Sequence, residues 1–203
     1  NVDASLLPTI SFPAFATHDP LLYSRTKAKV LKYLKGKWGF KRFLRDGFGT
    51  ILEDSTRRYY QEGETKDFDG VECDWPLFYL YMIIEGVFKG DEVQVKEYKE
   101  LLQPLMKLDA YGDPVVPKYF FLHDEHLSLE RKRSGSQARA GSKEGSARNL
   151  FLWGQSMWVI SSLLLENLLH VNELDLIRRH LPSFNRPNMT GRYSAFQSKV
   201  DNQ

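Results

Sequence analysis

Apolar residues recur at helical spacing in several separate stretches of the chain. In residues 21–34 they fall roughly on one face with lysines elsewhere, and Asp19, Pro20 and Gly36 supply start and stop signals. The buried face of this predicted helix holds Leu22, Val30, Leu31 and Leu34. Further helices are predicted over residues 74–88, 91–108, 150–169 and 173–180.

Other stretches lack the helical period. Pro8 and Pro13 predict an extended rather than a helical start to the chain. Residues 37–70 mix aromatic and charged side chains with glycines, and an irregular stretch of this length is typical of a functional loop. Residues 128–148 are rich in Ser, Gly and Ala and carry six basic against two acidic side chains, which predicts a mobile basic loop.

The alternation of helices with long loops bears on the fold class. No strand-rich region and no internal repeat is expected, and simple helical bundles prefer much shorter connections. The pattern therefore predicts a mainly α fold with long irregular loops. It suits a toroid of helical hairpins in which loops at one end line a pocket.

Composition excludes several classes of protein. The 203 residues are 42% hydrophobic and 27% charged, as in a soluble globular domain, and a net charge of +2 is too small to favour nucleic acid. The single cysteine, Cys73, excludes an internal disulfide and fits a reducing compartment. No apolar run reaches the length of a membrane span. Because the chain starts with Asn1 and stops in a polar stretch, we expect it to be a segment of a longer protein.

Two loops carry residues suited to sugar chemistry. Arg45 and Asp46 precede a glycine, and charged planar groups can hold sugar hydroxyls in fixed directions, although a surface salt-bridge loop has the same composition. Residues 67–74 place Glu72 and other carboxylates before Trp75. Capping of the next helix by Asp74 is one interpretation. The other interpretation is that a carboxyl group close to Trp75 acts as a general acid, because the apolar surroundings raise its pKa.

Other candidates are few. Trp153 stands at the start of the most apolar predicted helix, where an aromatic residue most commonly packs in the core. The first acidic residue after Trp153 is Glu166. Ser134 follows three basic residues, as an acidic kinase groove would require, and is a phosphorylation candidate. The chain has no phosphate-binding loop, no kinase signature and no metal-ligand spacing, so neither a metal nor another cofactor is predicted.

Eight short strings occur in order between residue 7 and the C-terminal region. They are Leu7 to Ala16, Gly39 to Gly47, Leu52 to Asp54, Phe68 to Glu72, Trp75 to Phe78, Gly86 to Phe88, Val115 to Tyr119 and Leu150 to Gln155. Together they resemble the N-terminal domain of the α and β regulatory subunits of phosphorylase kinase. By this resemblance residues 1–203 are part of one glucoamylase-like helical domain, with the basic loop 128–148 outside the matched pattern.

The resemblance also implies a site. Domains of this type are similar to glucoamylases, whose (α/α)6 barrel has its active site among loops at one end, so a partial (α/α)6 toroid is expected. Arg45 and Asp46 match the Arg-Asp-Gly string that holds the terminal sugar in glucoamylases, and Glu72 matches the catalytic acid. No carboxylate matches the base after Trp153. The implied carbohydrate-binding candidates are Arg45, Asp46, Glu72, Trp75 and Trp153, with no catalytic residue.

The function implied by this resemblance is that of a non-catalytic regulatory subunit of phosphorylase kinase, which controls glycogen breakdown. The implied partners are a catalytic kinase subunit, calmodulin and the sister regulatory subunit in a large hetero-oligomer, with α-glucan as a ligand of the pocket. The implied location is the cytoplasm, with membrane association where lipidation outside this segment provides it. Two alternatives stay open: an active glucan hydrolase of the glucoamylase class, and a carbohydrate-binding module that targets a kinase to glycogen.

Overall fold

A computed structural model describes residues 2–143, 146 and 149–187. Its helices are α1 (Leu6–Ile10), α2 (Pro20–Leu34), α3 (Leu77–Lys89), α4 (Glu92–Leu102), α5 (Leu127–Lys132), α6 (Leu152–Leu165) and α7 (Val171–Leu174), with 3-10 turns η1 (Glu64–Lys66), η2 (Gln103–Leu105), η3 (Asp124–His126) and η4 (Ser183–Asn185). Strands β1 (Lys107–Leu108) and β2 (Pro114–Val115) pair antiparallel, as do β3 (Phe120–Phe121) and β4 (Ala140–Gly141). The prediction of a mainly α chain is confirmed.

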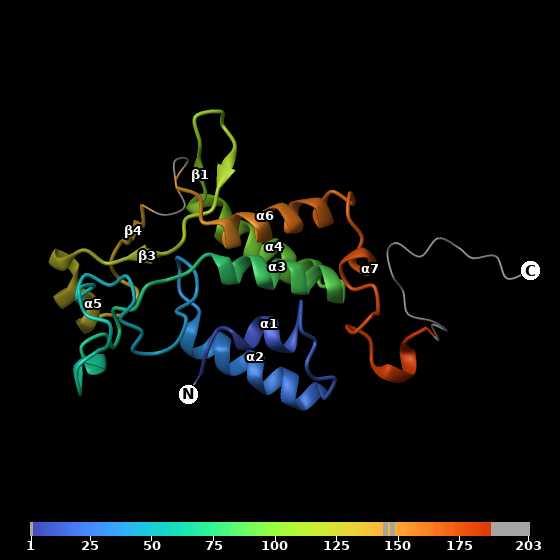
Figure 1. Ribbon diagram of the computed structural model, residues 1–203, viewed down its shortest axis with the longest axis horizontal. Coiled ribbons are helices and arrows are strands. Elements are labelled where there is room, and N and C mark those ends of the chain that lie inside the picture. Colours follow the sequence, from blue (N-terminus) through green and yellow to red (C-terminus); the bar gives the residue numbers. More distant parts are fainter. Residues whose placement is uncertain (1, 144–145, 147–148, 188–203) are drawn as a thin grey trace, which may run out of the picture.

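Helix α3 is the centre of the core. Every residue from Leu77 to Gly86 is buried, and the helix packs against α1, α4 and α6. Figure 1 shows α1 and α2 on one side of α3, and α4 and α6 on the other. Gly90 ends the helix in the left-handed conformation, at a φ of 65°, which suits a residue without a side chain.

Helix α2 matches its prediction closely. The Asp19 carboxylate accepts hydrogen bonds from the backbone of Leu21 and Leu22, and Pro20 occupies the first turn. Val30 and Leu34 are buried as expected, whereas the Leu22 side chain lies outside the core and is exposed. The apolar spacing therefore located the helix correctly, but it wrongly predicted that Leu22, near the start of the helix, is buried.

Several predicted boundaries are wrong. The helix predicted over 91–108 ends at Leu102 and tightens into η2, where Pro104 lacks the amide donor that an α-helix needs. The helix predicted over 173–180 is the single turn α7. The expected extended start contains α1, which accommodates Pro8 in a first turn whose amides have no intrahelical acceptor.

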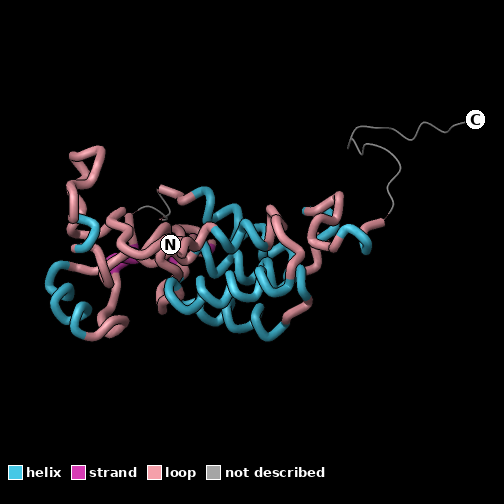
Figure 2. The backbone as a smooth tube through the Cα atoms, turned by 90° about the horizontal axis from the view of Figure 1, so that it is seen from below, coloured by secondary structure: helices cyan, strands magenta, loops and turns pink. Residues whose placement is uncertain are grey.

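The loops gather at the end of the helical layer where α2 ends and where α3 and α6 begin (Figures 1 and 2). The basic segment 128–148 lies at this end and is not wholly loop, because it contains most of α5 and all of β4. Glu130 and the Arg139 side chain are buried within it. Residues 144–145 and 147–148 lie outside the described part, and the mobility of the segment stays a prediction.

No helix among the described residues is long and apolar enough to cross a bilayer. The complete toroid stays a prediction.

Candidate functional site

Backbone crossings bring the two predicted sugar loops together. Phe40 and Trp75 exchange both backbone hydrogen bonds, at 3.1 and 2.8 Å, and Asp74 does the same with Phe120, at 3.0 and 2.8 Å. Gly39 allows the first crossing, because a Cβ there would lie 2.3 Å from the carbonyl carbon of Trp75. Residues 39–46 and 72–75 are thereby fixed beside each other.

Asp46 pairs with Arg42 and not with its neighbour Arg45. The Arg42 Nε and Nη2 atoms donate to the two carboxylate oxygens at 2.6 and 2.7 Å, and the Phe48 amide adds a third bond at 3.1 Å. The Asp46 residue is only 2% exposed. This two-pronged pairing of a guanidinium with a carboxylate is strong and directional, and it satisfies Asp46 within the protein.

Aromatic rings cover the guanidinium of Arg42. Its central carbon lies 4.7 Å from the centroid of the Phe48 ring and 5.0 Å from that of Trp75. Trp75 is buried against Phe48, Tyr119 and Phe151, with ring centroids 5.3–6.1 Å away. The Arg42–Asp46 pair therefore belongs to an aromatic cluster, in which cation–π contacts add to its stability.

Glu72 is held by the same loop from the other side. One carboxylate oxygen, Oε2, lies 2.7 Å from Lys41 Nζ, and Oε1 accepts the backbone amide of Arg45 at 2.7 Å. Glu72 has no exposed surface. A general acid must reach the leaving oxygen of its substrate. In this arrangement both oxygens of Glu72 face protein donors instead.

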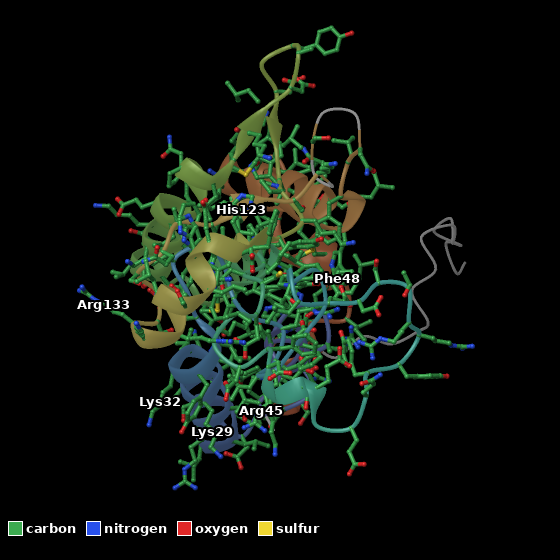
Figure 3. The ribbon with its side chains drawn as sticks, turned by 90° about the vertical axis from the view of Figure 1, so that its left-hand side faces the viewer. Lys29, Lys32, Arg45, Phe48, His123 and Arg133 are labelled. Atoms are coloured by element: carbon green, nitrogen blue, oxygen red, sulfur yellow. The ribbon has the colours of Figure 1, made fainter. Side chains whose placement is uncertain are left out.

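Arg45 and Trp153 differ from these buried groups. Arg45 has a φ of 64°, its side chain is half exposed, and its Nε lies 3.6 Å from Asp69. Figure 3 labels Arg45 and Phe48 at separate places in the view. Trp153 is also half exposed, and its indole Nε1 donates to the Tyr81 hydroxyl at 3.0 Å. Among the predicted sugar residues, these two side chains have the surface that a ligand could contact.

A second layer of ion pairs surrounds Glu72. Arg139 donates to the Glu72 backbone carbonyl, and its guanidinium lies 3.4 Å from Asp74 and 3.8 Å from Glu130. Asp74 is buried, and its Oδ1 accepts no hydrogen bond from the described residues. Burial raises the pKa of Asp74 to about 6, against the opposing pull of Arg139 and Lys41. The predicted cap role of Asp74 is wrong, since no side chain caps α3.

Gln155 stands at the position expected for a catalytic base, and its side-chain amide is hydrogen-bonded within the protein at both its oxygen and its nitrogen. Gln155 Oε1 accepts the Val116 amide at 3.1 Å, and its Nε2 donates to the Pro114 carbonyl at 3.0 Å. Glu166 follows the last residue of α6, at the end of the helix opposite Trp153. A rise of about 1.5 Å per residue separates the two by roughly 20 Å. Gln155 therefore anchors the strand segment at β2.

The sequence pattern did not identify Lys41, Arg42 and Arg139 as members of this network. Lys41 and Arg42 stand within the matched string, but which cation meets which carboxylate depends on tertiary contacts. Arg139 comes from a segment that composition marked as solvated. The described residues contain no group of three or more His, Cys, Asp and Glu side chains suited to a metal ion.

Comparison with known proteins identifies similar chains. No family model matches. The chain is 52% identical over 196 residues, 97% of its length, to a protein of Drosophila melanogaster named "probable phosphorylase b kinase regulatory subunit beta". It is 40% identical over 188 residues to the corresponding alpha subunit of that organism, and 38% identical to the liver isoform of the alpha subunit of Mus musculus. It spans only 15–17% of the length of these relatives.

Proposed function

This chain is related to the α and β regulatory subunits of phosphorylase kinase, and we propose that it is a segment of a β-type subunit that controls the kinase without catalysing a reaction itself. The observation that carries the proposal is similarity over nearly the whole chain, at 52% identity to the β subunit against 40% to the α subunit of the same organism. Control of glycogen breakdown follows from that role.

The buried carboxylates support a non-catalytic role. Hydrolysis of a glycosidic bond needs two carboxyl groups that reach the substrate from opposite sides. Asp46 and Glu72 are both satisfied by protein donors and almost completely buried. Further parts of a longer protein can only cover them more, so a conformational change would be needed to use either one. The alternative of a glucan hydrolase has no comparable support.

We propose that the loops nevertheless keep the form of a vestigial sugar site within a partial (α/α)6, six-hairpin toroid. Arg45 supplies exposed polar surface on a loop whose backbone is held by Glu72, which accepts the Arg45 amide. Trp153 supplies exposed aromatic surface, and the Phe151 ring lies between it and the buried Trp75. An aromatic face beside directional charged groups suits an α-glucan. This arrangement also fits the second alternative, a carbohydrate-binding module that targets a kinase to glycogen.

The proposed partners are a catalytic kinase subunit, calmodulin and the sister regulatory subunit, in the cytoplasm, with lipidation elsewhere in the protein as a route to membranes. The test is to assemble the whole protein that contains this sequence with the catalytic subunit and to measure phosphorylation of phosphorylase b. We expect lower activity in the assembly than with the free catalytic subunit, and relief on addition of calcium and calmodulin. Equal activity with and without the protein would contradict the regulatory role.

A further inference from the structure

A hollow of about 350 Å³ lies between the end of α2 and the segment after α5. We call it the α2–α5 hollow, and its lining includes Lys32, Lys37, Asp74, Glu130, Ser134 and Arg139. Neither Asp46 nor Trp75 lines it. It shares Lys41, Asp74 and Arg139 with the ion-pair network around Glu72, but none of the five predicted sugar residues lines it.

The charges of the hollow are unevenly matched. The carboxylates of Asp74 and Glu130 share the buried Arg139 guanidinium. Lys32 and Lys37 have no carboxylate partner among the described residues, and Lys37 Nζ donates to the neutral Gly135 carbonyl at 3.0 Å. Two carboxylates on one guanidinium leave a single negative charge, whereas Lys32 and Lys37 carry two positive charges with no carboxylate in ion-pair range among the described residues. The lysine side of the hollow therefore favours an anion.

Ser134 also lines the hollow, in the turn that follows α5. The buried Glu130 carboxylate accepts the amides of Gly135 and Gln137 at 2.6 and 3.0 Å, which holds the turn against α5. Ser134 is exposed. Figure 3 shows Lys32 on α2 and Arg133, the residue before Ser134, on the same side of the molecule.

We propose that Ser134 is a phosphorylation site whose phosphate is bound by Lys32 and Lys37, so that modification ties the α5–β4 segment to the end of α2. The three basic residues before Ser134 supply the recognition sequence, and the hollow supplies the receptor. A phosphoserine carries close to two negative charges and three acceptor oxygens, which match two ammonium groups. The proposal does not rest on the proposed function.

The covalent step is an ordinary phosphoryl transfer. The Ser134 hydroxyl oxygen forms a bond to the γ-phosphorus of ATP as the bond from that phosphorus to the bridging oxygen of ADP breaks. The hydroxyl proton leaves to the base of the modifying kinase. The co-reactants are ATP and a protein kinase that selects basic residues before serine.

The first test is site mapping. The whole purified protein is treated with ATP and such a kinase, and mass spectrometry locates the phosphate. We expect incorporation at Ser134 that is lost in Ser134→Ala and retained in Ser136→Ala, a matched control because Ser136 is exposed in the same turn. Absence of phosphate from Ser134 would overturn the proposal.

The second test asks what binds the phosphate. An unbound phosphoserine has a second pKa of about 6, and nearby ammonium groups lower it, so a ³¹P NMR titration reports the contact. We expect a pKa below 6 that returns toward 6 in Lys32→Gln/Lys37→Gln. It should stay low in Lys29→Gln, a control on α2 that does not line the hollow. Lys32→Gln alone, at an exposed position, serves if the double variant unfolds.

Hydrogen exchange of residues 127–143 provides the third measurement. Phosphorylation should slow exchange several-fold in the wild type and not in the double lysine variant. An unchanged pKa in the double variant would overturn the proposed contact. Equal protection of the Ser134→Ala protein by millimolar inorganic phosphate would also overturn it, because the hollow would then be a site for a free anion.

Discussion

The Lys41 ammonium lies 2.7 Å from a carboxylate oxygen of Glu72, a residue with no exposed surface, so the pair depends on both members. Removing one partner of a buried ion pair leaves an uncompensated charge, which typically costs about 3–5 kcal/mol. We expect Lys41→Met to lower the free energy of unfolding by about this amount in urea denaturation.

A matched surface pair sets the scale for that experiment. Lys96 lies 3.9 Å from Glu100, with both side chains mostly exposed. Exposed pairs of this kind contribute about 0–1 kcal/mol, so Lys96→Met should change the unfolding free energy little. Similar losses in the two variants would show that Glu72 does not need its partner.

Asp74 predicts an unusual pH dependence. Its pKa rises from 3.8 to about 6 on folding, so the folded state binds the proton more tightly than the unfolded chain. Its contribution to stability is therefore present at low pH and is lost as the pH rises between about 4 and 6. At 1.36 kcal/mol per pKa unit, the loss is roughly 3 kcal/mol. Urea unfolding of wild type and Asp74→Asn across this range should show the wild type losing that much relative to the variant. Parallel curves would contradict the assignment.

Gly39 should be irreplaceable for a reason that Gly63 does not share. Both have positive φ, 142° and 81°, but a Cβ at Gly39 would meet the Trp75 backbone, whereas one at Gly63 would meet nothing within 4 Å. Gly63→Ala should cost only the conformational strain of about 1–2 kcal/mol. Gly39→Ala should cost clearly more or prevent folding, as measured by thermal unfolding. An equal loss of stability in the two variants would show that the backbones of Phe40 and Trp75 can separate to make room for a side chain.

Local sequence signals predicted the four longer helices, α2, α3, α4 and α6, but not the partners of the charged side chains. Asp19 before Pro20 located the start of α2, because capping involves only neighbouring residues. Asp74 looked like a cap, yet its carboxylate faces Arg139, 65 residues away in the sequence. No local rule could identify that pairing.

In the loop that contains Asp46, local sequence also failed to identify the partner of a charged side chain, even though that partner is close in the sequence. Arg42 and Arg45 both stand within four residues of Asp46, and the positive φ of Arg45 accompanies a side chain that points toward Asp69. Composition likewise marked segment 128–148 as solvated, although Glu130 and Arg139 are buried there because they satisfy each other and nearby backbone amides. Polar composition alone does not reveal such mutual satisfaction.

The two tryptophans of the proposed sugar site should respond differently to substitution. Trp75 is buried among aromatic rings, so Trp75→Ala should cost about 3–5 kcal/mol of stability. Trp153 is half exposed, so Trp153→Ala should leave a folded protein. If the loops bind α-glucan, titration calorimetry with maltoheptaose should show weaker binding for Trp153→Ala. Unchanged binding would exclude Trp153 from the site.

We expect no glycoside hydrolysis, because neither the position expected for the catalytic acid nor the position expected for the base can perform its role. An inverting mechanism needs an acid and a base, each worth about 10²–10⁴ in rate, that reach the substrate from opposite faces. Glu72 is turned toward Lys41 and the Arg45 amide, and an amide such as that of Gln155 cannot take up a proton at neutral pH. Assays of glucose release from maltose and longer α-glucans should show no turnover for the wild type or for Glu72→Gln.

Asp46 is the group that could defeat this expectation, because a carboxylate released from its protein partner could activate water. Its two-pronged bond to Arg42 holds both oxygens and leaves the residue 2% exposed, so it would have to give up that bond to act as a base. Glucose release that disappears in both Glu72→Gln and Asp46→Asn, with folding preserved in each, would reveal a second conformation in which the two carboxylates face the substrate. Release that persists in both variants would point to a contaminating enzyme, and no release in any of the three proteins would leave a non-catalytic site.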